Sequence, residues 1–207
     1  MSKPEPNVIN QRPDSLHVTG QLSWKAAIAL FACFAPCVPF LAVAFGYCFI
    51  TPIHECGHLL ACRVLGIQVV KVNWANVESM RVAGWRENVM GFMGGFSAAS
   101  ALCLIYVLVG RTFNMVSGRV AFRPRLSVIV ASFSALIKAA VMVNIMVEVT
   151  SGILEGLLFL SVYRQVFGWP SGFIILLAFS CFSLFWQLRK LTQASPLSVL
   201  GELHGPV

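Results

Sequence analysis

The chain has 207 residues, of which 57% are hydrophobic and only 11% are charged, and its mean hydropathy is +0.79. Soluble domains average about 45–50% apolar and about 25% charged residues, so this composition excludes a water-soluble globule, a disordered chain and a coiled coil. The 15 lysines and arginines outnumber the 8 acids, but they lie between apolar runs and form no continuous stripe. We therefore interpret the net positive charge as a membrane-orientation signal and expect no nucleic-acid partner.

The two ends of the chain are polar, and we expect neither to enter the membrane. Residues 1–23 lack the basic start and short apolar core of a cleavable secretion signal, so they are predicted to form an N-terminal tail. Residues 191–207 are predicted to form a C-terminal tail. Residues 24–190 are then a single membrane-embedded domain.

The first apolar run, residues 24–65, exceeds the length of one ordinary crossing. A spanning helix needs about 20 mostly apolar residues, because every backbone polar group must be satisfied inside the hydrocarbon. We therefore divide the run into two crossings, at about 24–45 and 47–66, with a turn between them. The alternative is one long crossing preceded by a broken half-helix that Pro36 and Pro39 terminate.

The remaining apolar segments complete an all-α polytopic membrane protein of about six crossings, or five if the alternative holds. They occupy residues 89–110, 126–147, 148–162 and 173–188. Between the first run and these segments, residues 67–88 alternate weakly between apolar and charged side chains, which indicates a short β-like or re-entrant connector at one surface.

The basic residues predict an orientation for six crossings. Nine fall on the side of the N-terminus and five on the other side. The positive-inside rule then places both termini in the cytoplasm, although the arginines of residues 111–125 lie on the opposite side and disagree.

The most informative pattern is an H-E-x-x-H motif, formed by His54, Glu55, Cys56, Gly57 and His58. On a helix, residues four apart are separated by about 40° net and about 6 Å of rise, so both imidazoles can converge on one metal ion. Glu55 lies beside them, close enough to move protons without being a ligand. Two neutral imidazoles, a carboxylate and an open position on the metal are what metal-assisted hydrolysis requires, and Zn²⁺ is the expected cofactor.

The surroundings of the motif favour a functional role over a chance match. The motif lies inside an apolar segment, where an acidic side chain costs about 2.5–3.5 kcal/mol on insertion scales. Two histidines and a glutamate within five membrane positions are hard to explain as packing. We therefore interpret His54 and His58 as metal ligands and Glu55 as a catalytic acid–base.

A catalytic zinc usually takes three protein ligands, so a third must come from another segment. The remaining histidines lie in the polar ends, and the other carboxylates within apolar segments are Glu148 and Glu155. On a helix that continues past Gly152, these two share one face with Asn144 and Ser151. A polar stripe in lipid must face protein, water or an ion. The stripe therefore predicts a ligand here, with a hydrogen-bonded helix contact or a short cytoplasmic helix end as the alternative.

These features resemble the site-2 protease family of intramembrane zinc metallopeptidases. Residues 54–58, followed by small and apolar residues, Arg63 and Gly66, look like the family's H-E-x-G-H segment. The β-like connector then leads to a glycine-rich helix start at residues 91–99, although Gly95 is not followed by the proline of the family pattern. The small residues of this run predict close helix approach.

The resemblance also implies roles for later residues. In the family an Asp-Gly pair supplies the third zinc ligand, and the nearest match here is Glu155-Gly156, with Glu in place of Asp. This favours Glu155, while Glu148 stays open. The resemblance further implies that Asn144 adds a hydrogen bond to the developing oxyanion.

The leading functional hypothesis is a zinc metalloprotease that hydrolyses peptide bonds in or near the transmembrane segments of a membrane protein, in contact with membrane lipid. The substrate must unwind locally, and the connector at residues 67–88 could pair with the unwound strand by edge addition. A plain surface loop is the alternative for this connector.

Two other functions are consistent with parts of the pattern. A non-proteolytic membrane scaffold or assembly subunit could retain a metallopeptidase-like fold within a larger membrane complex, as small size and the irregular third-ligand region suggest. A metal transporter or haem-binding protein could use the two histidines, but the adjacent Glu55 and the lack of a second metal-binding cluster argue against it.

Overall fold

The computed structural model describes residues 23–80, 84–120, 124–157, 168 and 170–193, without the side chains of residues 118, 120, 124 and 125. Nearly all of both predicted tails lies outside these residues, so the domain boundaries stay predictions. The elements in chain order are α1 (Trp24–Phe34), α2 (Cys37–Phe45), the π-helical turn η1 (Gly46–Ile50), α3 (Thr51–Leu65), β1 (Val69–Asn73), β2 (Asn76–Ser79), α4 (Trp85–Val120), α5 (Pro124–Leu157) and α7 (Ser171–Gln193).

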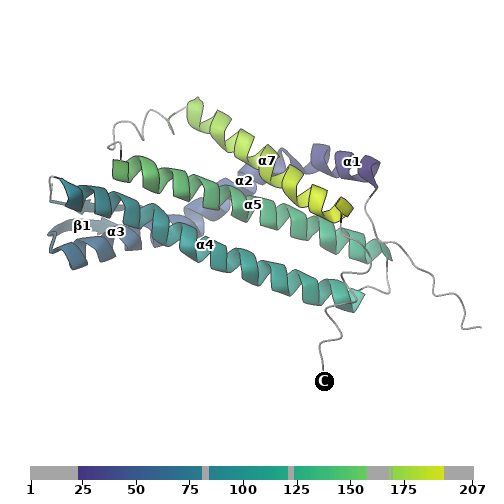
Figure 1. Cartoon of the computed structure of the whole chain (residues 1–207), viewed down its shortest axis with the longest axis horizontal. Coiled ribbons are helices and arrows are strands. Elements are labelled where there is room, and N and C mark those ends of the chain that lie inside the picture. Colours follow the sequence, from purple (N-terminus) through teal and green to yellow (C-terminus); the bar gives the residue numbers. More distant parts are fainter. Residues whose placement is uncertain (1–22, 81–83, 121–123, 158–167, 169, 194–207) are drawn as a thin grey trace, which may run out of the picture.

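Among the described residues, four helical segments are long and apolar enough to cross a membrane. They are Cys37–Leu65, Trp85–Ser117, Leu126–Leu157 and Ser171–Gln193. The long helices α4 and α5 run side by side in opposite directions, and α7 packs on the far side of α5 (Figure 1). The expectation of an all-α, multi-pass membrane protein is therefore confirmed.

The predicted division into six crossings differs from the structure at two places. The chain does not turn near residue 46, because α2 continues through η1 into α3 as one helical run. The short helix α1 precedes this run, ending before Pro36, which lacks the N–H needed to extend it. The segments predicted at 126–147 and 148–162 are one helix as far as Leu157, and residues 158–162 lie outside the described part.

The π-helical turn η1 lies directly before the helix that carries the H-E-x-x-H motif. Pro52 stands in the first turn of α3, and in an unbroken α-helix its ring would clash with the carbonyl of residue 48. A π turn lengthens the local hydrogen-bond ring and makes room for such a residue. The Thr51 hydroxyl also donates to the Gly46 carbonyl at 3.2 Å.

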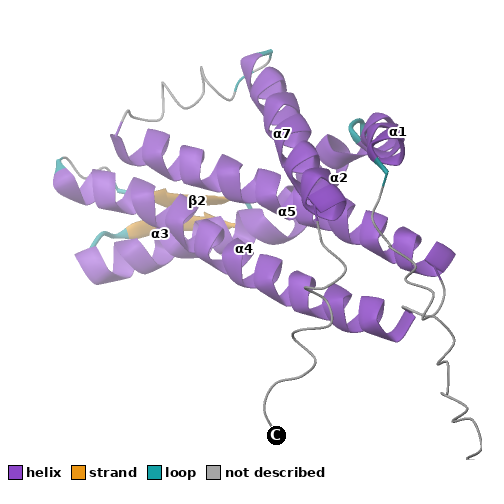
Figure 2. Cartoon of the chain, turned by 45° about the vertical axis from the view of Figure 1, so that its right-hand side comes forward, coloured by secondary structure: helices purple, strands orange, loops and turns teal. Residues whose placement is uncertain are grey.

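The connector after α3 is a β-hairpin, as its alternating sequence predicts. Helix α3 ends at Gly66, whose φ of +67° suits glycine, and the Ile67 N–H returns to the Cys62 carbonyl at 2.8 Å. Strands β1 and β2 then pair antiparallel with Val72 opposite Val77. The hairpin lies alongside α3 (Figure 2).

Small residues on α4 bring its neighbours together. A Cβ at Gly95 would overlap the backbone of α5 at Gly152, and a Cβ at Gly57 of α3 would overlap the backbone of α4 at Met93. Because α4 has few side-chain atoms at these contacts, α3 and α5 both approach it closely, and the histidines of α3 reach Glu155 of α5. The close helix approach that the glycine-rich start of α4 predicts is therefore confirmed.

The four-segment arrangement redistributes the basic residues between the two ends of the bundle. The end at which α1 begins also holds the end of α4, the start of α5 and the end of α7, whereas the hairpin lies at the other end (Figure 1). Nine basic residues belong by sequence to the first end and five to the hairpin end: Arg63, Lys71, Arg81, Arg86 and Arg164. The arginines of residues 111–125 now agree with the majority, and cytoplasmic termini stay a prediction.

Candidate metal centre

The two histidines of the motif point from one face of α3 toward α4 and α5, and backbone and carboxylate groups fix their rings. His58 Nδ1 lies 2.8 Å from the Met90 carbonyl, and His54 Nδ1 lies 2.6 Å from Glu148 Oε2. A carbonyl and a carboxylate only accept hydrogen bonds, so both Nδ1 atoms are the donors. Each Nε2 atom of a neutral imidazole then carries a lone pair.

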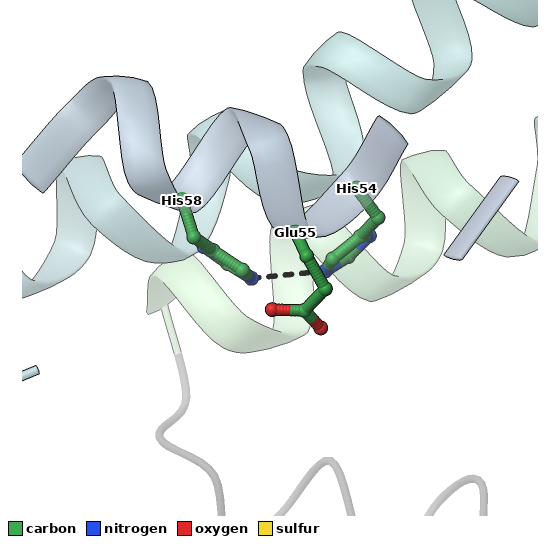
Figure 3. Close-up of side chains that lie close together, drawn as sticks. All are labelled: His54, Glu55 and His58. Atoms are coloured by element: carbon green, nitrogen blue, oxygen red, sulfur yellow. Dashed lines mark hydrogen bonds between the residues drawn. The ribbon is translucent and has the colours of Figure 1, made fainter. Parts of the chain in front are cut away.

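The two Nε2 atoms converge on a carboxylate from α5. They lie 3.0 Å apart (Figure 3). Glu155 Oε2 lies 3.4 Å from His54 Nε2 and 3.3 Å from His58 Nε2. The side chains of the three residues are only 10–15% exposed. When both imidazoles are neutral with the proton on Nδ1, three electron-pair donors therefore face one another in a region with little water.

This triangle of donors fits a metal cation. Three lone pairs at these distances repel one another unless a proton or a metal cation lies between them; a proton on one Nε2 atom makes the hydrogen bond between the two rings, and a metal ion would replace it. Tetrahedral zinc with bonds of about 2.0–2.1 Å separates its ligand atoms by about 3.3 Å, close to the three separations measured here. With both histidines neutral, a divalent ion would also balance the charges of Glu148 and Glu155, which satisfies the requirement that buried charges be compensated.

Gly94 of α4 lies directly against the two imidazoles of the donor triangle. A Cβ at this position would lie 2.7 Å from His54 Nε2 and closer still to the His58 ring. Any other residue would therefore fill the space between the imidazoles. The sequence shows only that Gly94 belongs to a run of small residues suited to helix packing. Its place beside the imidazoles depends on how α3 and α4 pack together.

Glu55 lies next to the histidine pair on the same helix but toward the hairpin. Its carboxylate offers an oxygen within 4.8 Å of a nitrogen of each imidazole, and Figure 3 shows it beside the two rings. Glu55 Oε2 accepts a hydrogen bond from the Val77 N–H of β2 at 2.8 Å. The hairpin thus holds the carboxylate at the edge of the centre, a contact for which the sequence offers no signal.

Both carboxylates left open by the sequence lie at the centre, in different positions. Helix α5 continues past Gly152, so Glu148, Ser151 and Glu155 do share a face. The Ser151 hydroxyl donates to Glu155 Oε1 at 3.0 Å and orients that carboxylate. Glu155 faces the Nε2 atoms, whereas Glu148 contacts only the Nδ1 side of His54.

Asn144, the candidate for oxyanion stabilisation, is bonded to the helix backbone. Its amide nitrogen donates to the carbonyls of Ala42 at 3.1 Å and Ala140 at 3.0 Å. Its Oδ1 lies where a Cβ at Gly46 would otherwise project. Asn144 thus joins α5 to α2, and an oxyanion role would require it to give up one of these bonds.

The chain matches no protein-family model, no curated protein and no solved structure. What the sequence and the geometry establish together is a multi-pass membrane protein with an H-E-x-x-H group that can hold a metal ion.

Proposed function

We propose that the chain is a membrane-embedded zinc metallopeptidase of the site-2 protease kind, which hydrolyses peptide bonds in or near transmembrane segments of other proteins. The observation that carries this proposal is the convergence of His54 Nε2, His58 Nε2 and Glu155 Oε2 beside a further carboxylate, Glu55.

His54, His58 and Glu155 would hold the zinc ion, whose chemistry is to polarise a carbonyl and to lower the pKa of water to about 7. Glu148 fixes the ring of His54 through Nδ1, which leaves Nε2 available as a ligand atom. The Met90 carbonyl does the same for His58. Such outer contacts select the tautomer and raise the basicity of the ligand.

Glu55 is the proton carrier in this proposal. Its Oε2 is held by the Val77 N–H, so the carboxylate is positioned before a substrate arrives. It accepts a proton from the attacking water as the oxygen–carbon bond forms at the scissile carbonyl. It then gives that proton to the amide nitrogen as the carbon–nitrogen bond breaks.

The hairpin gives an unwound substrate a place to bind. A helical peptide bond is shielded by its own hydrogen bonds, so the substrate must become extended near the site. The Val77 N–H bonds Glu55 rather than β1, which turns this edge of β2 toward the centre. We propose that the extended substrate segment lies along this edge.

The test combines metal content with cleavage for the full chain in detergent or vesicles. The wild type is expected to bind about one zinc ion per chain and to cleave a membrane-spanning peptide. Glu55→Gln is expected to keep its zinc and lose cleavage. Zinc binding without cleavage by the wild type, across a panel of membrane peptides, would reject the peptidase and favour a scaffold that retains the metal.

A further inference from the structure

A cavity of about 130 Å³ opens between α3 and the hairpin, on the side of Glu55. Glu55 forms part of its wall, so the cavity adjoins the group that moves protons in the proposed reaction. The other side chains in its wall are almost all apolar: Pro52, Cys56 and Leu59 of α3, and Val72, Trp74 and Val77 of the hairpin.

The hairpin register explains why this wall is apolar. Val72 and Val77 are cross-strand partners, so their side chains lie on the same face of the hairpin. That face covers Leu59 and Cys56 of α3. The charged pair Lys71 and Glu78, one position away along each strand, lies on the opposite face of the hairpin.

The size of the cavity matches one apolar side chain. An apolar cavity of about 150 Å³ accommodates a benzene ring, so a space of about 130 Å³ suits a branched aliphatic or phenyl side chain. It offers no counter-charge to an acidic or basic side chain except Glu55, which the Val77 N–H already holds.

We infer that this cavity is a specificity pocket for a large apolar side chain, such as leucine or phenylalanine, of the substrate segment being cleaved. The inference rests on the proposed peptidase function and adds the class of substrate residue to it. Val77 of the hairpin and Leu59 of α3 line the pocket from its two sides. A substrate anchored there has its neighbouring peptide bond beside the Glu55 carboxylate.

The experiment uses the full chain in detergent and a set of membrane-spanning peptides with a Gly/Ser-rich centre. The peptides differ at one central residue, which is Ala, Leu, Phe or Asp. Cleavage is followed by mass spectrometry, and binding to the metal-free wild type by fluorescence anisotropy. A hydrophobic pocket discriminates by about 10–200-fold per methylene-scale difference, so we expect Leu and Phe to exceed Ala and Asp by about tenfold or more in kcat/KM and in affinity.

Variants that fill the pocket test its location. Val77→Phe and Leu59→Phe fill it from opposite walls and are expected to abolish the preference for Leu and Phe. Val70→Phe is the matched control, because Val70 lies on the same hairpin, is exposed and does not line the cavity. If Val77→Phe disturbs the hairpin, the result for Leu59→Phe alone decides whether the preference depends on this pocket.

The two readouts separate this inference from the peptidase proposal. Cleavage without a preference, or a preference that both filling variants retain, overturns the pocket and leaves the peptidase intact. A binding preference that the filling variants lose, without cleavage of any peptide, supports the pocket and rejects the peptidase. Neither binding preference nor cleavage rejects both.

Discussion

Replacing Glu148 by glutamine separates the residue that would bind the metal from the residue that would orient a ligand. Glu148 Oε2 lies 2.6 Å from His54 Nδ1, away from the Nε2 atoms, whereas Glu155 Oε2 lies 3.3–3.4 Å from both Nε2 atoms. The variant Glu148→Gln keeps an acceptor oxygen for Nδ1 but removes the negative charge. Glu155→Gln removes the charged donor from the triangle itself.

The expected magnitudes follow from these two geometries. A hydrogen bond to an ionised acceptor is roughly twice as strong as a neutral one, and substitution of a group that orients a metal ligand typically costs 10–100-fold in metal affinity. We therefore expect Glu148→Gln to weaken zinc binding by about 10–100-fold, or about 1.4–2.8 kcal/mol. Glu155→Gln is expected to weaken it further.

Zinc affinity is measured by competition with a chelating dye on the purified full chain. Glu87→Gln is the control, because it removes the same charge from an exposed position in the first turn of α4. Loss of zinc from Glu148→Gln together with unchanged affinity in Glu155→Gln would refute the assignment and make Glu148 the ligand.

Two further substitutions test the packing around the centre. Gly94→Ala is expected to abolish zinc binding in the same dye assay, because its Cβ would enter the donor triangle. Gly110→Ala on the same helix is the control: its Cβ meets only the end of a lysine side chain, 3.7 Å away, so this variant is expected to bind zinc like the wild type. Asn144→Ala removes the donor to the buried Ala42 carbonyl. It is expected to lower the free energy of unfolding by about 1–3 kcal/mol and to leave the zinc content unchanged. A lower kcat at unchanged thermal stability would instead show that Asn144 takes part in the peptide hydrolysis.

The side chains that share a helix face could be predicted from the sequence, because this depends on helix geometry alone. His54 and His58 are one turn apart whatever surrounds them, and Glu148 and Glu155 share a face of any uninterrupted helix. Helix geometry alone did not choose between the two glutamates, because the choice depends on the rotation of α5; only the resemblance of Glu155-Gly156 to the family's Asp-Gly pair favoured Glu155. The contact of Gly95 with Gly152 sets that rotation, and spacing within one helix carries no information about it.

The number of crossings was harder to predict because hydropathy does not reveal how a long apolar run is divided. The first run contains three prolines: Pro36 follows the end of α1, Pro39 lies in the first turn of α2, and Pro52 is accommodated by the π turn η1. Only the structure distinguishes a proline that follows the end of a helix from one that is accommodated within a helix. The hydrogen bond from the Val77 N–H to Glu55 could not be predicted from the sequence either, because it joins residues 22 positions apart that meet only in the folded chain.

X-ray absorption at the zinc edge of the reconstituted full chain tests the metal centre most directly. The account predicts about one zinc ion per chain, with nitrogen and oxygen donors at about 2.0–2.2 Å and the imidazole scattering of two histidines. All seven cysteines are free thiols, so sulfur donors at about 2.3 Å would show that zinc binds elsewhere. That result, or no bound zinc, would contradict a centre built from His54, His58 and Glu155.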